Sequence, residues 1–566
     1  MNRATSARLG AAAVSGALLA AARPPLDAGA VACIAFVPLF VAWRGRPPRA
    51  MAGYAFVAGI VYFALLLSWT WYFGAVAIVP LVAVLAAYWA ASGALIGWLA
   101  RRGVANPFLV AAVWVLAEAA VARFPLGGFS WGEVGYAFHN IEIGRALASD
   151  GGVELVSFFA VALNAFLADA LIAAFDRTAP AVDRRTLARA GAGLAVVGLL
   201  PVGALIARTA PHPDGTMRIA IVQGNDLDRD PTPADGPRYL PASHFALAAR
   251  IHAPVDLVVF PESSMNTDAG ADPRTDPYLH ENLVAVAKRT GAWVLANASV
   301  DAPAQGSEPA GARALNLDVL LRPDGSLEGT YAKRHLVPFG EYVPFRSLLE
   351  GHIKALEQVP RDFEPGHAPG LFEVAHHEIA TIICFESAFG YQVRPLVHAG
   401  AQVIVLSTNN RSYERSANSA QHVAIGQMRA AETGRPLVQA AISGISAVID
   451  ANGVVHQRTQ LFRNTVVQAT ITPTTGETPY VRYGEWAIWA CGAGLLAALG
   501  LAVAPATLRR GRRSRFVESE TAIPDESEPA GSRIVGDQTE APSGAAPVGN
   551  LTNSSASSEP RPGEIA

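Results

Sequence analysis

Three side chains, Glu262, Lys333 and Cys384, are of the types that nucleophilic catalysis combines. A cysteine nucleophile needs a base that removes its proton and a donor that stabilises the developing oxyanion. A glutamate and a lysine supply these two functions. Glu262 follows the apolar run DLVVFP, Cys384 ends the run IATIIC, and Lys333 lies between them in YAKRHLVPFGEYVPF (331–345). We therefore treat the three residues as a candidate catalytic set.

Lysine is rare in this chain, which makes Lys333 conspicuous. The other lysines are Lys288 and Lys354, whereas lysine and arginine together number 44. A retained lysine in such a chain is typical of a site that needs a compact ammonium group. Taken singly, a strand-end glutamate is usually a cap, a lone buried cysteine is usually inert and a lysine is usually solvated. Their combination in one domain favours catalysis.

The residues between 212 and 483 predict an α/β domain. β-Branched runs bounded by turn residues predict buried strands, at 217–225, 256–263, 292–300, 378–386 and 402–410. Amphipathic patterns predict helices at 238–252, 277–290 and 416–434. Alternating strands and helices indicate two-sided sheets, and reactive groups collect at the strand ends of such sheets. Glu262 and Cys384 stand at two of these ends.

The rest of the chain is apolar enough to lie in a membrane. The sequence is 51% hydrophobic and 16% charged, against roughly a quarter charged in soluble proteins. Crossing a bilayer takes about 20 apolar residues. About eight transmembrane helices are predicted, near 8–22, 27–43, 53–74, 78–100, 105–122, 152–175, 188–207 and 484–506. The first two are short and joined by RPPLD, which allows either a hairpin or a broken pair. The net charge of −3 gives no indication of nucleic-acid binding.

Arginines predict the orientation of these helices. They follow every second predicted helix, at positions 44, 46 and 49, then 101 and 102, then 177, 184, 185 and 189, and finally 509, 510, 512, 513 and 515. The positive-inside rule places those connections and both termini in the cytoplasm. The predicted domains are helices one to seven (1–207), an extracytoplasmic catalytic domain (208–483), helix eight (484–506) and a cytoplasmic tail (507–566). The tail is rich in Ser, Pro, Glu and Gly, which predicts disorder.

The three cysteines separate by region. Cys33 and Cys491 fall in predicted membrane helices, where a thiol usually packs as a small apolar group. Only Cys384 lies in the catalytic domain, so a disulfide within that domain is excluded. No His/Cys cluster has metal-ligand spacing and no glycine loop is suited to phosphate, so we expect no metal or cofactor.

The segments FPES, KRHLVPFGEYVPF and ICFES, in this order, resemble the Glu–Lys–Cys triad of the nitrilase (carbon-nitrogen hydrolase) superfamily. Seven predicted helices before this domain and one after it resemble the membrane-embedded apolipoprotein N-acyltransferase family. Residues 422–453 also resemble the family segment that follows the nucleophile. The resemblance extends from about residue 8 to 506 and excludes the tail. It implies an α-β-β-α sandwich on a base of membrane helices.

The resemblance also implies a reaction at the outer face of the bacterial inner membrane. An acyl chain would pass from a phospholipid to the α-amine of the diacylglyceryl-cysteine of an apolipoprotein. Glu262 would be the general base, Lys333 the oxyanion stabiliser and Cys384 the nucleophile. The bilayer, the phospholipid donor and the lipid-modified acceptor are the implied partners.

Further residues match the family pattern. Glu341 matches a second family carboxylate. Phe385 and Glu386 match an aromatic–glutamate pair after the cysteine, and the N–H of Phe385 is a candidate second oxyanion donor. His422 also matches a family position, but a histidine at a helix start is more often structural and receives no role.

The sequence departs from the family in two loops. The loop after QGN lacks the family's tryptophan, which leaves substrate positioning open, and the turn after STNN has Tyr413 as its one aromatic residue. Two alternatives remain: a membrane-tethered nitrilase-type amidase that acts on a small amide, and an inactive lipid-binding scaffold. The aromatic loop at 124–140 is consistent with a lipid entry site or with a plain interfacial belt.

Overall fold

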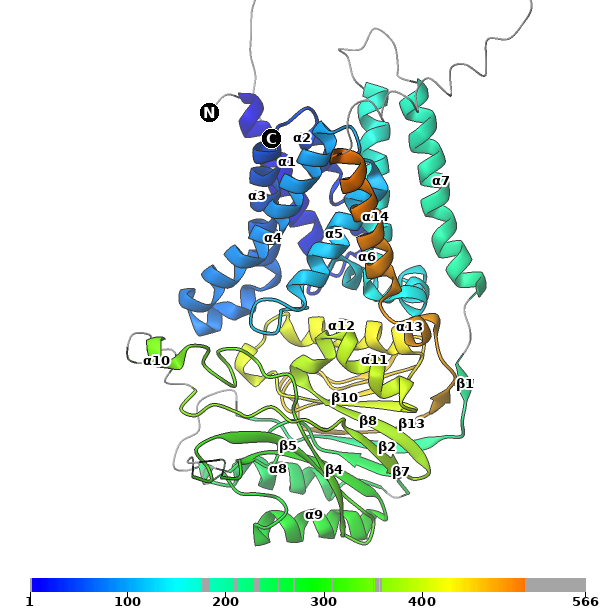
Figure 1. Ribbon diagram of the computed structural model, residues 1–566. Helices are drawn as coiled ribbons and strands as arrows, with labels where there is room; N and C mark the ends of the chain where they lie inside the picture. The colour runs from blue at the N-terminus through cyan, green and yellow to red at the C-terminus, as the bar shows by residue number, and fades with distance from the viewer. Residues whose placement is uncertain are drawn as a thin grey trace, which may run out of the picture. The chain divides into compact units, whose positions relative to one another are not determined.

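The computed structural model describes residues 3–175, 184–207, 211–227, 235–252, 254–267, 270–304, 306, 309–349, 351, 356 and 359–503. Residues Met1–Val503 form one compact unit. The tail predicted at 507–566 lies outside the described residues. Within the compact unit a bundle of helices lies next to an α/β region (Figure 1).

Six of the described helices are long and apolar enough to cross a membrane. They are α1 (Arg3–Ala21), α3 (Pro48–Leu66), α4 (Ala75–Arg101), α6 (Glu142–Phe175), α7 (Arg184–Ala207) and α14 (Trp486–Val503). The predicted helices at 27–43 and 105–122 correspond to shorter segments, η1 (Gly29–Cys33) with α2 (Val37–Trp43), and α5 (Pro107–Val121). The α-helical membrane region is therefore confirmed, whereas the count of eight spans stays a prediction.

Two helix boundaries differ from expectation. The first pair is broken rather than a continuous hairpin: α1 ends at Ala21 and a short 3₁₀ helix precedes α2, since Pro24 and Pro25 cannot continue a helix. Helix α6 begins at Glu142, ten positions before the predicted start at 152. It bends at Gly151 and Gly152, whose backbone angles are non-helical. Apolar patterning located only the half after this glycine pair.

The α/β region contains two six-stranded mixed sheets. The first has the order β13 (Thr465–Ile471), β2 (Met217–Gln223), β3 (Leu257–Val259), β4 (Trp293–Asp301), β5 (Ala314–Leu321), β6 (Leu327–Ala332). The second has the order β12 (Val455–Arg458), β11 (Ala447–Ile449), β10 (Leu437–Ala441), β9 (Val403–Thr408), β8 (His377–Ile383), β7 (Leu371–Val374). Strands β2, β3 and β4 are parallel, as are β8, β9 and β10. All five predicted strands are present.

The two sheets pack face to face through buried β-branched and aliphatic side chains, such as Ile219 and Val259 on one and Ile379 and Val403 on the other. Helices α8 (Tyr239–Ala248) and α9 (Pro277–Thr290) cover the outer face of the first sheet. Helices α11 (Gly390–His398) and α12 (Asn418–Thr433) cover the second. Figure 1 shows these four layers, which confirm the predicted α-β-β-α sandwich.

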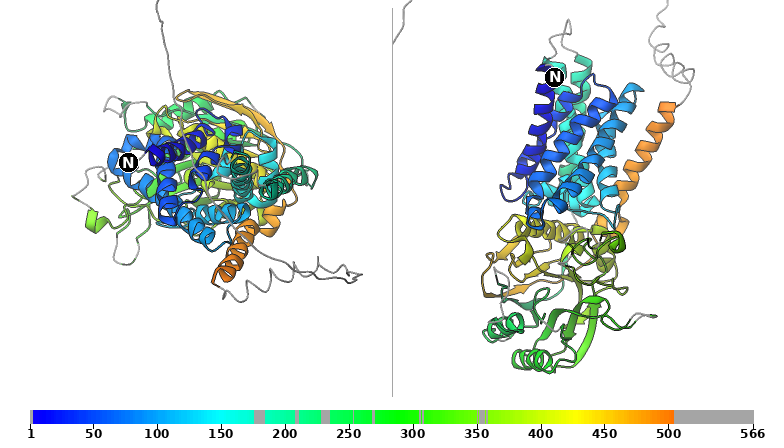
Figure 2. Two further views of the ribbon diagram at one scale, coloured as in Figure 1. Left: turned by 90° about the horizontal axis from the view of Figure 1, so that it is seen from above. Right: turned by 90° about the vertical axis from the view of Figure 1, so that its left-hand side faces the viewer.

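Helix α12 lies between the second sheet and the helical bundle (Figures 1 and 2). All of its residues except Ala420 are buried. One side chain, Gln421, joins several segments there. Its Oε1 accepts hydrogen bonds from the indoles of Trp69 (3.1 Å) and Trp131 (2.8 Å). Its Nε2 donates to the carbonyls of Leu66 (3.0 Å) and Pro24 (3.2 Å). These bonds fix the four layers of the α-β-β-α sandwich, called the catalytic layers below, against the helical bundle.

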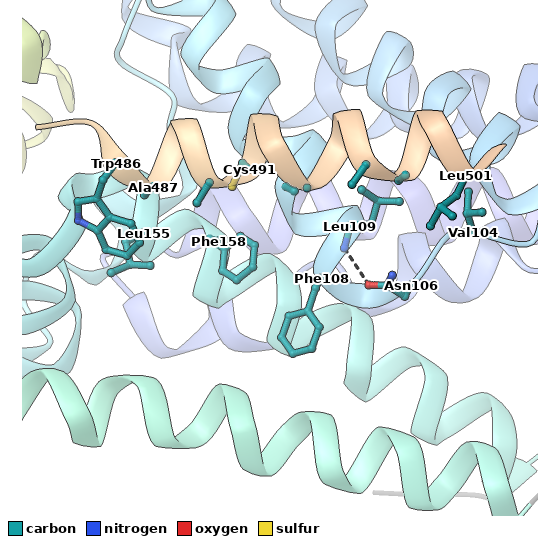
Figure 3. A pocket seen from close by; sticks show the side chains of 15 residues that line it. Val104, Asn106, Phe108, Leu109, Leu155, Phe158, Trp486, Ala487, Cys491 and Leu501 are labelled. Carbon is teal, nitrogen blue, oxygen red and sulfur yellow. Dashed lines mark hydrogen bonds between the residues drawn. The ribbon is translucent and has the colours of Figure 1, made fainter. Parts of the chain in front are cut away.

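Helix α14 leaves an apolar groove of about 410 Å³ where it meets α5 and α6 (Figure 3). Phe158 and Cys491 line the groove, and Trp486 anchors the start of α14 by donating a hydrogen bond to the carbonyl of Asp150 (2.7 Å). Cys491 therefore packs in the helical region, as its position in an apolar segment predicts.

Candidate active site

The ends of β3, β6 and β8 bring the predicted residues to one place. Glu262 follows β3, Lys333 follows β6 and Cys384 follows β8. Strands β3 and β6 run in the same direction within the first sheet, since β5 is antiparallel to its neighbours β4 and β6. Their carboxyl ends therefore share one edge. Cys384 reaches the same place from the second sheet, where the charges of Glu262 and Lys333 both act on its thiol.

Lys333 lies between two carboxylates. Its Nζ is 2.9 Å from Oε1 of Glu341 and 3.3 Å from Oε1 of Glu262, and its side chain is only 1% exposed. Burial by itself would lower the pKa of Lys333, but Glu262 and Glu341 raise it well above its usual range. The ammonium group therefore stays charged at neutral pH and holds both carboxylates near it.

Glu262 is oriented by further donors. Asn316 Nδ2 donates to its Oε1 (2.7 Å), and the backbone N–H of Asn409 donates to its Oε2 (2.7 Å). Asn316 also donates to Oε1 of Glu341 (3.0 Å), while its own Oδ1 accepts from Asn297 (2.9 Å). Asn316 was not predicted from the sequence. The available signal is polar residues at alternate positions of β5, Asn316 and Asp318, inside an otherwise apolar strand.

Cys384 is the first residue of η6 (Cys384–Ala388) and directly follows the end of β8. Its φ of 53° lies in the left-handed region, which is uncommon for a residue with a side chain. Burial, reinforced by the charge of Glu262, raises the pKa of the Cys384 thiol to about 12, although Lys333 opposes this shift. The thiol is therefore protonated at neutral pH, and a base must remove its proton before it can attack.

His422, on α12, contacts the loop that carries Cys384. Its Nε2 is 2.8 Å from Ser387 Oγ and 3.2 Å from the Cys384 carbonyl oxygen. Its Nδ1 is 3.2 Å from Thr408 Oγ1, and Thr408 Oγ1 in turn donates to Cys384 Sγ (3.4 Å). Burial lowers the pKa of His422 to about 4, so the ring is neutral at pH 7. The sequence indicated no role for His422 and did not single out Thr408.

Glu386 binds backbone rather than the sulfur. Its carboxylate accepts from the N–H groups of Ile383 (2.7 Å), Arg334 (2.7 Å) and His335 (3.1 Å). Tyr331 donates its hydroxyl to the same carboxylate at 2.8 Å. Burial raises the pKa of Glu386, although these donors favour its charged form. Glu386 thus ties the loop of Lys333 to the loop of the cysteine.

Phe385 belongs to an aromatic cluster. Its ring centroid is 5.0 Å from that of Phe389 and 5.8 Å from that of Phe129, which belongs to the predicted aromatic loop at 124–140. Within that loop Trp131 is 3% exposed and Phe124 is 69% exposed. The loop is therefore packed against the catalytic layers at Phe129 and Trp131 and open at Phe124. Its use as a lipid entry site stays a prediction.

Tyr413 adds an aromatic side chain from the catalytic layers. Its ring centroid is 4.7 Å from that of Trp69 and 5.7 Å from that of Phe73, both on η2 (Ser68–Phe73). Burial raises the pKa of Tyr413, and Cys384 adds to this shift when its thiol is ionised. The loop without the family's tryptophan includes residues 228–234, which lie outside the described residues.

The described part of the chain contains no group of three or more His, Cys, Asp or Glu side chains arranged to hold a metal ion. The groups that act on the Cys384 thiol are instead the carboxylate of Glu262, the ammonium of Lys333 and hydrogen-bond donors such as Thr408. Such a set can remove a proton from a thiol and stabilise an oxyanion.

Two family models match the chain. Residues 15–166 match the apolipoprotein N-acyltransferase N-terminal domain, and residues 218–480 match carbon-nitrogen hydrolase. An apolipoprotein N-acyltransferase from Geobacter metallireducens is 31% identical, covering 86% of this chain and 94% of the relative. Another from Azotobacter vinelandii is 31% identical, covering 83% and 90%.

A solved CN-hydrolase superfamily protein from Xanthomonas campestris is similar to this chain at 20% identity and a TM-score of 0.35, covering 50% of this chain and 97% of that one. The matches to the relatives from Geobacter and Azotobacter extend over both the helical and the α/β regions. Together with the six apolar helices, they indicate a membrane protein. The chain belongs to the apolipoprotein N-acyltransferase family.

Proposed function

We propose that the protein transfers an acyl chain from a phospholipid to the α-amine of the diacylglyceryl-cysteine of an apolipoprotein, through a thioester on Cys384. The observation that carries the proposal is the buried ammonium of Lys333, which contacts Glu262 and Glu341 beside Cys384. Membership of the family supplies the substrate class.

In the first half-reaction, Glu262 takes the proton from the Cys384 thiol while the sulfur attacks the ester carbonyl of the phospholipid. The charge that develops on the carbonyl oxygen is stabilised by Lys333 and the backbone N–H of Phe385. The tetrahedral intermediate then collapses. The lysophospholipid oxygen leaves with the proton held by Glu262, and the acyl chain remains on sulfur.

In the second half-reaction, the free amine of the acceptor attacks the thioester carbonyl. Glu262 takes the proton that the amine loses and returns it to the departing sulfur. An amide is formed and the Cys384 thiol is restored. The acyl chain passes first to the enzyme and then to the lipoprotein, and the lysophospholipid leaves between the two steps. Ping-pong kinetics are therefore expected.

Both substrates are lipids, so the site must lie close to the outer face of the inner membrane. We place residues 208–483 outside the cytoplasm, helices one to seven in 1–207, helix eight in 484–506 and the segment 507–566 in the cytoplasm. The arginine-rich connections support this orientation. The bonds of Gln421 to Trp69 and Trp131 would keep the catalytic layers at the membrane surface.

The decisive experiment incubates the purified full-length protein with a phospholipid that carries a labelled acyl chain, and withholds the acceptor. A hydroxylamine-sensitive label is expected on the protein. Cys384→Ala should abolish it, whereas Cys33→Ala and Cys491→Ala, the matched controls, should retain it. A label that persists in Cys384→Ala would exclude the mechanism.

The alternatives give different results in this assay. A tethered amidase would release ammonia from a small amide and leave the protein unlabelled by phospholipid. An inactive scaffold would bind phospholipid without a covalent label in any of the cysteine variants.

A further inference from the structure

A second cavity lies in the helical bundle, far from Cys384. Helix α4 shows where the cavity lies. The helix begins at Ala75, directly after η2, and the ring of Phe73 on η2 packs against Tyr413 of the α/β region. The helix is 27 residues long, which corresponds to roughly 40 Å at about 1.5 Å per residue. The cavity is lined by residues of its last turn, including Arg101. It therefore opens at the end of the bundle opposite the catalytic layers.

The cavity combines a cationic rim with an apolar interior. Its volume is about 780 Å³, within the range of about 300–1,000 Å³ that is typical of ligand pockets. Arg44, Arg46 and Arg101 line it, and all three side chains are exposed to solvent. Among the described residues that line it, Asp169 is the one acidic side chain, and it interacts electrostatically with Arg44. The described part of the rim therefore carries a net positive charge.

The interior wall is built from aromatic and aliphatic groups. Phe40, Trp43 and Met51 line it, and the Trp43 indole donates to the Met51 carbonyl (3.1 Å), which fixes the wall. At Gly97 a Cβ atom would lie 2.7 Å from Cα of Pro48. Helices α3 and α4 thus meet in close contact at this side of the cavity.

We propose that this cavity binds the phosphate headgroup of an anionic phospholipid from the leaflet at this end of the helices. In the orientation proposed above, this is the cytoplasmic leaflet. Guanidinium groups donate paired hydrogen bonds to phosphate oxygens. The apolar wall receives the first methylenes of an acyl chain. Basic pockets between membrane helices on the cytoplasmic side are suited to such headgroups.

Arginines that only set the orientation of the helices in the membrane would not need a cavity of this kind. The positive-inside rule requires arginines in the connection, but no cavity and no aromatic wall. Arg49 makes the distinction testable, because it lies in the first turn of α3, directly after the connection that carries Arg44 and Arg46, and does not line the cavity. A general attraction to anionic lipid would involve Arg49 equally, whereas a headgroup site would involve Arg46 and Arg101.

The test uses delipidated full-length protein titrated with phosphatidylglycerol, phosphatidylethanolamine or inorganic phosphate, with bound lipids counted by native mass spectrometry. Arg46→Ala/Arg101→Ala should weaken the binding of one phosphatidylglycerol about twentyfold, because one arginine near an anionic lipid contributes about fivefold in affinity. Arg49→Ala should change this affinity by less than about twofold. The difference between wild type and double variant separates this lipid from any lipid bound near Cys384.

A second variant tests the cavity without changing its charge. Ala100 is an exposed lining residue, and Ala100→Trp should remove the same bound lipid by filling the cavity. Normal binding by Ala100→Trp, or an equal loss in Arg49→Ala, would overturn the proposal. Equal affinity for phosphatidylethanolamine would also overturn it, as would saturation of the site by inorganic phosphate in place of lipid.

Discussion

Thr408 contacts both His422 and the candidate nucleophile Cys384. Its Oγ1 is 3.2 Å from His422 Nδ1 and 3.4 Å from Cys384 Sγ. Asn410 Oδ1 is a further acceptor, 3.3 Å from the same hydroxyl. The hydroxyl has a single proton to donate and three acceptors around it. A thiolate is the strongest of these acceptors, so ionisation of Cys384 should draw the proton of Thr408 toward sulfur.

Thr408→Val should make the Cys384 thiolate harder to form. A hydrogen bond to a charged group favours that charged form, so its loss raises the pKa of the Cys384 thiol further above its usual range. We expect alkylation of Cys384 to slow by about tenfold or more at a fixed pH. The measurement is the rate of iodoacetamide labelling against pH, in a Cys33→Ala/Cys491→Ala background.

Thr408→Ser is the matched control, because it keeps the hydroxyl and should label at nearly the wild-type rate. In wild type the labelling rate should rise about tenfold per pH unit through pH 8 to 10, since the thiolate is the reactive form. Identical profiles for the valine and serine variants would rule out a role of the hydroxyl at sulfur.

Lys333→Arg should reduce thioester formation by about a hundredfold or more, in the range of losing one oxyanion donor. Lys333 is almost fully buried between two carboxylates, so the larger planar guanidinium cannot place its charge where the ammonium lies. The assay is the initial rate of acyl labelling from phospholipid. Lys288→Arg, on the exposed surface of α9, is the control and should react normally. Near-normal labelling by Lys333→Arg would return Lys333 to a structural role.

Glu262→Gln and Glu341→Gln should differ although both residues contact Lys333. Glu262→Gln removes the proposed base, and general-base catalysis contributes about a hundredfold to ten-thousandfold. Glu341→Gln leaves the base and the Lys333–Glu262 contact in place, so its loss of rate should be at least tenfold smaller. Single-turnover labelling of both variants makes the comparison. Equal losses would mean that the carboxylates act as one structural unit.

Reporter fusions test the proposed orientation. A reporter that is active only outside the cytoplasm should be active when fused after residue 300 and silent when fused after residue 520. The expectation follows from the arginines that flank alternate predicted helices. The reverse pattern would place the catalytic domain in the cytoplasm and would contradict the membrane arrangement.

The strands and the ends that carry Glu262 and Cys384 were predictable, because buried β-branched runs stop at residue types that do not suit a core. Glu341 was found by its segment, and it does contact Lys333. The length of α6 was not predictable from apolar patterning, because its first turns precede the bend at Gly151 and are less apolar than the rest.

The contacts of Asn316 and His422 could not be read from the sequence. A polar residue in a strand shows which face it shares with its neighbours, but not which loop of another strand it will meet. Thr408 and His422 are 14 positions apart, at the end of β9 and on α12. Only the packing of α12 on the second sheet brings them together under Cys384.

The four hydrogen bonds of Gln421 affect how the protein unfolds. One amide satisfies two indoles and two carbonyls from the helices and turns of the bundle. Pulling the sheets away from the bundle would leave all of these groups unpaired in a buried place, and each loss carries the cost of an unmet polar group. Neither a glutamate nor a leucine could make the same four bonds. The catalytic layers and the helices should therefore melt in a single cooperative transition, and a soluble fragment cut from the membrane base should not retain the native arrangement of α12.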